Sequence, residues 1–591
     1  MSTQNNRRTS PGGMTGEVIL LWAGILIVGA VVGSVWLAAT LGHRLAGTNQ
    51  DLPKNPVELT VGVFSGDIPW PAAGTPILAG VGVLLLAFLV FVLVVRHRFG
   101  ASRTRVDGSA RYLARGRDLA HLSEKGAAAT AARLGVTGAP GVPIGRAVND
   151  GRMLYGSWED MHLDIWGPRT GKTTSRAIPA ILAAPGAVLV TSNKRDIVDA
   201  TRDVRAGHGP VWVFDPQAVA REDPEWWWNP LEYVTDEVKA AKLAEHFASG
   251  SREAGSKGDA YFDASGQDLL AGFLLAAALD GRPITDVYTW LTRPTNPEPA
   301  EILYEHGYRL SADQLTGILN APDKQRGGIY GTAQQMASCL TNCSITAWVN
   351  PTGTDDTRPR FDPAAFVANG GTLYSLSREG KGTAGPLVTA LTVAVVEAAE
   401  EIASCSAGGR LAVPLVGVLD EAANVCRWRE LPNLYSHYGS RGIVLMTILQ
   451  SWSQGVEVWG REGMRKLWSA SNVAVYGGGV KEADFLKELE QLIGDYDRLS
   501  TSTSLGKGHR TVSQQLQRDR ILDVAQLGAM PRGRALVIAS GAPPALVRTV
   551  PWMADQHAEA VKASIKNHDP LAKQSLTELA DTGTPEGAAR G

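Results

Sequence analysis

Cysteine is scarce in this chain of 591 residues, which contains only Cys339, Cys343, Cys405 and Cys426. Four unevenly placed cysteines cannot supply the disulfide framework of a small secreted protein, so we expect the main part of the chain to be cytosolic. Cys339 and Cys343 would share one face of a helix, but no second Cys or His pair with zinc-like spacing lies nearby. We therefore expect buried apolar cysteines in preference to a metal site.

The chain also lacks an excess of charge of either sign, because its 57 Lys and Arg residues nearly balance its 59 Asp and Glu residues. A formal net charge of −2 neither supports nor excludes a nucleic-acid-binding surface, which needs only a local basic patch. Hydrophobic residues make up 44% of the chain, enough for a substantial buried interior and against a mainly disordered chain. At this length we expect several folded units.

Two long uncharged runs lie near the N-terminus, at residues 18–41 and 77–95. Each provides the roughly 20 apolar residues that a helix needs to cross a bilayer. Either run could instead be a buried helix of a soluble protein, and the first a cleaved signal peptide. The first run is longer than a signal peptide's apolar core, however, and a second run follows it. We predict a membrane anchor over residues 17–95, with a short external loop at 42–76.

Basic residues flank this anchor: Arg7 and Arg8 precede the first run, and four arginines between 96 and 105 follow the second. Because Lys and Arg are retained on the cytoplasmic side, we predict a two-pass protein of the cell membrane, inner or plasma. Both termini and the main part of the chain should be cytoplasmic. We expect residues 1–16 to be flexible and 96–150 to form a basic juxtamembrane linker.

Residues 161–183 read as an apolar strand, a glycine-containing turn and a helix, which is the context that a P-loop requires. Backbone N–H groups around Gly171 would bind phosphate, Lys172 would reach the β- and γ-phosphates, and the Thr173 hydroxyl would ligate Mg²⁺. Trp166 stands where the standard motif has its first glycine, so the loop is effectively one residue shorter. The predicted nucleotide contacts are Gly167, Pro168, Arg169, Thr170, Gly171, Lys172, Thr173 and Thr174.

A second apolar strand, residues 415–419, ends in Asp420 and Glu421. Asp420 in that position can hold Mg²⁺ together with Thr173, and Glu421 can orient or deprotonate the attacking water. A Gly-Lys-Thr turn is weak evidence by itself, and an acidic pair after a strand is commonly a solvated turn. Their joint occurrence predicts an ATP hydrolase with ATP and Mg²⁺ as cofactors.

Short apolar runs at 187–191, 211–214, 443–449 and 473–476 are separated by segments of helical length. This alternation predicts an α/β fold with a mostly parallel sheet that is covered on both faces. Nucleotide should bind at the carboxyl edge of the strands.

Helical periodicity dominates residues 236–350, which predicts an inserted all-α domain. The nucleotide-binding domain would then consist of residues 151–235 and 351–553. Residues 554–591 are polar and predict a flexible tail. Three consecutive tryptophans, 226–228, could stack on bases, but their position at the start of the helical insertion favours packing.

A set of motifs in a fixed order resembles the coupling-protein ATPases of conjugation and type IV secretion, the TraG/TraD-type family. These motifs are GSARYLA at 108–114, the P-loop, WNPL at 228–231, YFDASGQDLL at 261–270, LDEAANVCRWRELPNL at 419–434, SRGI at 440–443 and ILQSWSQ at 448–454. The resemblance covers nearly the whole chain up to about Trp552. No single motif is specific, but the ordered set is.

The resemblance implies a RecA-like P-loop motor with an inserted all-α domain, assembled as a hexamer that hydrolyses ATP. It implies that Gln450 senses the γ-phosphate and positions water. The family often has an arginine finger in a Gly-Arg-Ser-Arg-Gly run, where this chain has Tyr-Gly-Ser-Arg-Gly at 438–442. Arg441 is the candidate finger, with pairing to an acidic residue as the alternative.

The implied partners are DNA, expected to be single-stranded with a bound relaxase, and the components of a type IV secretion channel. Two alternatives stay open. An FtsK-type DNA translocase shares the motor and the anchor, but its C-terminal winged-helix module has no room after Trp552. A membrane scaffold with a degenerate P-loop would bind partners without hydrolysis.

Overall fold

The computed structural model describes residues 16–48, 52–99, 104–251, 259–353, 355–380, 382–506 and 509–569. The chain divides into two compact units, one of residues 1–105 and 496–519 and one of residues 106–495 and 520–591. Apart from Gly16, the predicted flexible N-terminus lies outside the described residues.

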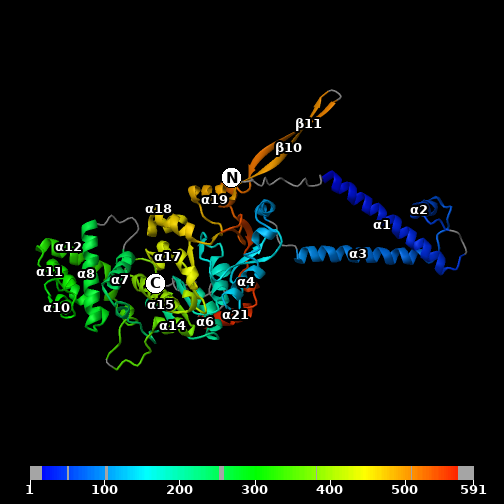
Figure 1. The fold of residues 1–591 in the computed structure, drawn as a ribbon. Helices are drawn as coiled ribbons and strands as arrows, with labels where there is room; N and C mark the ends of the chain where they lie inside the picture. Colours follow the sequence, from blue (N-terminus) through cyan, green and yellow to red (C-terminus); the bar gives the residue numbers. More distant parts are fainter. Residues whose placement is uncertain are drawn as a thin grey trace, which may run out of the picture. The chain divides into compact units, whose positions relative to one another are not determined.

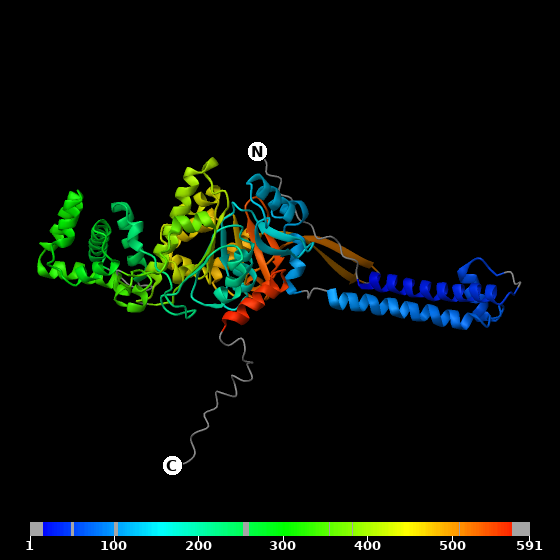
Figure 2. The same ribbon diagram turned by 90° about the horizontal axis from the view of Figure 1, so that it is seen from below.

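The first unit contains two long apolar helices, α1 (Gly16–Leu45) and α3 (Gly74–Phe99), which lie side by side (Figure 2). Both are long and apolar enough to cross a membrane, over Ile27–Leu45 and Gly74–Phe91. They contain the two predicted spans. The intervening segment is more ordered than the predicted loop, because it forms helix α2 (Pro56–Ser65), which Asn55 caps.

A two-stranded sheet, β10 (Asp495–Gly506) and β11 (His509–Arg520), also has most of its residues in the first unit. Cross-strand ion pairs join Arg498 to Asp519 at 3.6 Å and Arg518 to Asp497 at 3.9 Å. The sequence does not indicate this sheet, because its residues are mostly polar and lack the alternation of a half-buried strand. It lies within residues 351–553, which we assigned to the nucleotide-binding domain.

The second unit is built on a sheet that has 11 strands among the described residues (Figure 1). Its parallel part has the order β9-β3-β8-β7-β4-β6-β5, and the antiparallel strands β12, β13, β1 and β2 extend it beyond β9. The strands are β1 (Val142–Ala147), β2 (Met153–Gly156), β3 (His162–Ile165), β4 (Val188–Ser192), β5 (Val211–Phe214), β6 (Thr372–Leu376), β7 (Leu415–Leu419), β8 (Ile443–Leu449), β9 (Val473–Tyr476), β12 (Arg534–Ala539) and β13 (Ala545–Arg548).

Both faces of the central strands are covered, as the sequence predicts. Every residue of β4, β7 and β8 is buried, so side chains that alternate between the two faces are all shielded from solvent. Apolar side chains of α5 (Ile178–Ala183) and α6 (Asp196–Ala206) join one core cluster with alternate residues of these strands. Contacts to β8 also come from α15 (Gly385–Cys405), α17 (Leu431–Tyr438) and α18 (Trp452–Ala470).

The predicted linker over 96–150 is wrong for much of its length. Residues 142–147 form β1, whose Ile144 and Ala147 are buried in a core cluster with Val547 of β13. Helix α4 (Glu124–Arg133) and two short 3₁₀ helices precede β1. The Pro, Gly and Arg residues inside β1 interrupt its apolar run, which hides the strand in the sequence.

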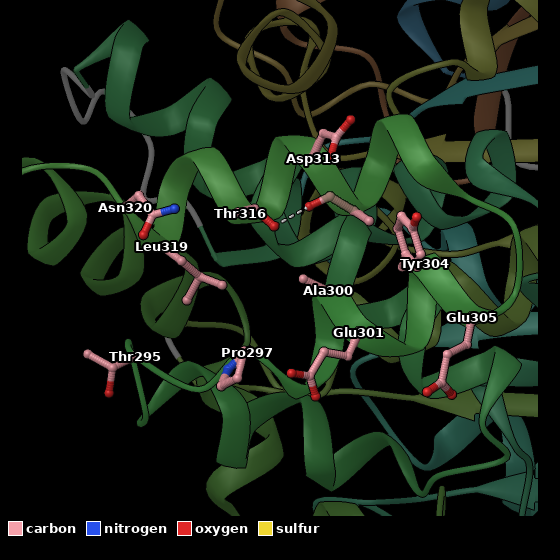
Figure 3. A pocket seen from close by; sticks show the side chains of 11 residues that line it. Thr295, Pro297, Ala300, Glu301, Tyr304, Glu305, Asp313, Thr316, Leu319 and Asn320 are labelled. Atoms are coloured by element: carbon pink, nitrogen blue, oxygen red, sulfur yellow. Dashed lines mark hydrogen bonds between the residues drawn. The ribbon is translucent and has the colours of Figure 1, made fainter.

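The described residues between 236 and 350 form helices and contribute no strand. The helices are α7 (Glu237–Ser251), α8 (Ala260–Leu279), α9 (Ile284–Leu291), α10 (Glu298–Glu305), α11 (Arg309–Leu319), α12 (Asp323–Met336) and α13 (Cys343–Thr346). A pocket of about 590 Å³ lies between α10 and α11, lined by acidic side chains and by Tyr304 (Figure 3). Whether this helical segment is an independent domain stays a prediction.

Trp226 and Trp228 are buried, as expected, whereas Trp227 is half-buried. Trp226 makes edge-to-face contacts with Trp212 at 5.2 Å and Trp348 at 5.6 Å between ring centroids. Trp228 is also buried. The Trp226 ring therefore joins β5 to the end of the helical segment, and neither of these two buried rings is available to stack on bases.

The predicted flexible tail is wrong for residues 558–568, which form helix α21 (Ala558–His568) against α6. Val561 is buried, and Ile565 packs against the same cluster. The Ser564 hydroxyl donates to the carbonyl of Asp199 at 2.6 Å. Two apolar positions are too few to reveal a helix by periodicity. Residues 570–591 lie outside the described part of the chain.

The buried His246 of α7 should make the protein less stable in acid. Burial and, to a smaller extent, the nearby Lys242 ammonium lower the pKa of His246 to about 3. The unfolded chain binds a proton near pH 6.5 and the folded chain does not, so the free energy of unfolding should fall by about 1.4 kcal/mol per pH unit below 6.5. We expect the thermal midpoint to drop less between pH 7.5 and 5.5 in His246→Leu than in the wild type. The exposed His306→Leu is the control, and an equal drop in all three proteins would contradict the prediction.

Candidate nucleotide-binding site

The P-loop follows β3 directly and has the backbone of a tight phosphate-binding turn. Gly171 has φ of 96° and Arg169 has φ of 59°, so both are left-handed, and glycine is favoured at the first. The Thr170 hydroxyl donates to the carbonyl of Gly167 at 2.5 Å, and the Thr174 hydroxyl donates to that of Gly171 at 3.1 Å. The chain then enters a π-helical turn at Thr173–Ala177, which leads into α5. Pro168 is exposed, like Arg169.

Gly167 and Trp166 explain how the shortened loop is accommodated. The Gly167 N–H donates to the carbonyl of Gly478 at 2.9 Å, and a Cβ on Gly167 would lie 2.2 Å from the carbonyl oxygen of Gly479. Trp166 is buried over Gly477, where a Cβ would meet its ring at 2.0 Å. Close backbone approach therefore requires glycine on both sides. The run of three glycines directly after β9 is a signal for this contact that our sequence analysis missed.

Lys172 lies between the two carboxylates that follow β7. Its Nζ is 3.1 Å from Oδ1 of Asp420 and also contacts Oε1 of Glu421. Their side chains are 11%, 3% and 1% exposed, so this charge cluster is nearly closed to solvent. β4 and β7 are adjacent parallel strands, and the Asp420 N–H donates to the carbonyl of Thr191 at 3.2 Å. The sequence-predicted P-loop and acidic pair thus meet at the carboxyl edge of the sheet.

The pKa values of this cluster reflect its burial. Burial raises the pKa of Asp420 to about 6, although Lys172 opposes that shift. Burial also lowers the pKa of Lys172, but Asp420 and Glu421 raise it by more, so the ammonium is retained. Within the described residues, Oδ1 of Asp420 is buried and accepts no well-aligned hydrogen bond. An oxygen of this kind, beside the start of the P-loop helix, suits Mg²⁺, which prefers oxygen ligands.

Gln450 follows the end of β8 and reaches the same cluster. Its side-chain amide donates to both oxygens of Glu421, at 2.8 Å and 2.7 Å. Glu421 has φ of 55°, unusual for a residue other than glycine. Lys172 and Gln450 together hold this strained residue.

Arg441 does not reach this cluster. It lies in the turn Gly439–Arg441 before β8, at the opposite end of that strand from Gln450, and its Nε is 3.6 Å from Glu400 of α15. The acidic pairing that we kept as its alternative role is present in this chain. A finger acts across a subunit interface, so that role of Arg441 stays a prediction.

A buried ion pair connects β3 with the helical turn that follows the P-loop, and our sequence analysis missed it. Arg176, four residues after Lys172, forms two hydrogen bonds with Asp164 of β3, at 2.6 Å and 3.1 Å, and both side chains are fully buried. Arg176 also donates to the carbonyl of Pro143, and the Trp166 indole donates to Asp164 at 3.2 Å. An Asp inside a buried strand is a signal that could have revealed this pair.

We expect Arg176→Ala to lower the free energy of unfolding by about 3–5 kcal/mol, because it leaves the Asp164 carboxylate buried without its cation. Denaturant unfolding of the full-length protein measures the loss. Arg133→Ala removes an exposed pair with Glu159 and should cost at most about 1 kcal/mol. Equal midpoints for the two variants would show that the buried pair does not stabilise the fold.

Comparison with known proteins bears on this site. Residues 414–532, which contain Asp420, Glu421 and Gln450, match the family model TraG-D_C, described as the TraM recognition site of TraD and TraG. The resemblance to TraG/TraD-type coupling proteins is therefore confirmed. None of the curated proteins compared with the chain matches it in sequence.

The fold is similar to that of the bacterial conjugative coupling protein TrwB. An unbound monoclinic form of TrwBdeltaN70 has 16% identity and a TM-score of 0.50, and the match covers 69% of this chain and 87% of that one. A trigonal form in complex with sulphate has 15% identity and a TM-score of 0.52, with 74% and 93% covered. The predicted fold class, a RecA-like α/β fold with a mostly parallel sheet and two apolar N-terminal helices, is confirmed.

Proposed function

We propose that this chain is a membrane-anchored coupling-protein ATPase that recruits DNA, single-stranded with a bound relaxase, and pumps it into a type IV secretion channel. One observation carries the proposal: Lys172 of the P-loop, Asp420 and Glu421 after β7, and Gln450 after β8 form one cluster. These four residues come from three separate segments of the sequence and meet at one place. ATP hydrolysis needs these chemical groups at one edge of a parallel sheet.

Each residue then has a role in hydrolysis. The phosphate tail, an anion, competes with Asp420 and Glu421 for the Lys172 ammonium and is bound by the N–H groups of the P-loop. Mg²⁺ held by Thr173 and Asp420 would neutralise the charge that develops on the phosphates. Glu421, freed from Lys172, accepts a proton from the attacking water or orients it. Gln450 holds Glu421 and reports the presence of the γ-phosphate.

DNA and protein partners follow from the coupling-protein type. A motor that moves along arbitrary sequence must grip mainly phosphates, so DNA binding should weaken steeply with salt. The segment that matches a TraM recognition site supports a surface for a partner protein within residues 414–532. The two apolar helices support a two-pass anchor in the inner or plasma membrane, with the ATPase in the cytoplasm. We propose a hexamer as the working form.

Phosphate release by the full-length protein in lipid nanodiscs tests the proposal. We expect Mg²⁺-dependent release that single-stranded DNA stimulates and that Lys172→Ala abolishes. Release equal to that of Lys172→Ala, with and without DNA, would leave the non-hydrolysing scaffold as the explanation. Stimulation by duplex DNA alone would favour an FtsK-type translocase.

A further inference from the structure

The segment Gly-Gly-Gly-Val-Lys-Glu at 477–482 joins β9 to α19 (Ala483–Ile493) and contacts two parts of the candidate site. Its glycines contact the P-loop. The carbonyl of Gly478 accepts the Gly167 N–H at 2.9 Å, and a Cβ on Gly479 would lie 2.7 Å from the Thr170 methyl group. The segment is thus fixed to the P-loop at its first end.

At its other end, Glu482 contacts the beginning of α18. Its carboxylate accepts the Trp452 N–H and the Ser453 N–H, each at 3.0 Å. The first N–H groups of a helix have no partner inside the helix, and the positive end of the helix dipole favours an anion there. Glu482 therefore binds the N-terminus of α18 by two charge-assisted hydrogen bonds.

The first turn of α18 in turn holds Gln450. The Ser451 hydroxyl caps the helix by accepting the Gln454 N–H at 3.3 Å, and the Gln454 side chain accepts the Gln450 N–H at 3.0 Å. The Gln450 side-chain amide then donates to both oxygens of Glu421. Hydrogen bonds at both ends of the first turn of α18, joined by its backbone, thus connect Glu482 with the proposed catalytic carboxylate.

Aromatic packing holds Glu482 in place independently of its charge. Trp452 stacks on Phe485 of α19, with ring centroids 5.2 Å apart and planes 20° apart. Phe485 also contacts Trp468 and Tyr476 edge to face, each at 5.9 Å. α18, α19 and β9 therefore stay packed when the carboxylate is changed, which makes an isosteric substitution informative.

We infer that Glu482 is a positioning residue for ATP hydrolysis: it anchors the N-terminus of α18 and thereby holds Gln450 against Glu421. The inference rests on the proposed function, because it assigns Glu482 a part in that reaction. Glu482 does not contact the P-loop lysine or either of the carboxylates after β7 in the described structure, so its effect should pass through Gln450.

Glu482→Gln keeps the size of the side chain and removes its charge and one acceptor. We expect kcat for ATP hydrolysis to fall about tenfold, because Gln450 is then held less firmly against Glu421, with KM for ATP within about twofold. The matched control is Glu488→Gln on the same helix, an exposed glutamate that should leave kcat unchanged. The two variants should unfold at the same temperature.

A double-mutant cycle separates positioning from a merely structural role. If Glu482 acts through Gln450, the double variant Glu482→Gln/Gln450→Ala should be no slower than Gln450→Ala alone. Gln454→Ala breaks the same connection at another hydrogen bond and should reproduce the loss in kcat, which provides a second route if Glu482→Gln folds poorly. If the fold-losses in kcat of the two single variants multiply in the double variant, Glu482 does not act through Gln450 and the inference is overturned.

The outcomes also separate this inference from the proposed function. Wild-type hydrolysis equal to that of Lys172→Ala means that the proposed function fails. An active wild type with equal kcat in Glu482→Gln and Glu488→Gln means that only the role of Glu482 fails.

Discussion

Lys172→Ala should lower kcat for ATP hydrolysis by about a thousandfold, comparable to the loss of a group that stabilises transition-state charge. Lys172 is the cation that the structure places between Asp420 and Glu421. Without it, two buried carboxylates face each other, and their repulsion opposes both the ionised state and the approach of phosphate. Phosphate release under saturating Mg²⁺ and ATP measures the effect.

The exposed Lys562→Ala on α21 is the control for this experiment and should keep the wild-type rate. A Lys172→Ala protein that retained a third or more of wild-type turnover would place hydrolysis elsewhere in the chain. It would also mean that the P-loop of this chain contributes to folding but not to ATP hydrolysis.

Glu421→Gln should separate nucleotide binding from turnover. The amide has the size of the carboxylate but cannot accept a proton from water, so we expect kcat to fall by about 10² to 10³ while the affinity for a fluorescent ATP analogue changes only a few-fold. Lys172 would still contact Asp420.

Asp420→Asn provides the contrast, because a proposed metal ligand should affect Mg²⁺-dependent nucleotide affinity as well as turnover. Affinity losses of the same size in Glu421→Gln and Asp420→Asn would contradict separate roles for the two carboxylates. Turnover by Glu421→Gln near the wild-type rate would exclude Glu421 as the base.

The parallel core could be predicted because its strands are buried on both faces. The apolar runs 211–214, 443–449 and 473–476 coincide with β5, β8 and β9. The antiparallel strands could not be predicted so easily. Arg534 is the first residue of β12 and Arg146 lies inside β1. The charge of Arg534 is satisfied by Asp107, a partner more than 400 positions away.

The candidate site likewise has residues that could be predicted from the sequence and residues that could not. Lys172, Asp420 and Glu421 belong to short local motifs, so their chemistry is visible in the sequence. The contacts that hold them depend on the fold. The pairing of Glu482 with the N-terminus of α18 has no local signature, and of the pair Arg176 with Asp164 only the Asp inside a buried strand is visible in the sequence. Arg441 also belongs to a short local motif, but neither the sequence nor one subunit can test its proposed role, because an arginine finger acts on a neighbouring subunit.

The position of α21 has a practical consequence for shortened versions of the protein. Ile178 and Leu182 of α5, in the helix that continues from the P-loop, share a cluster with Val561 and Ile565. A chain that stops at Ala554 would expose that apolar surface of α5 to solvent. We expect such a chain to aggregate or to give less soluble protein. A shortened version should therefore keep α21 through His568.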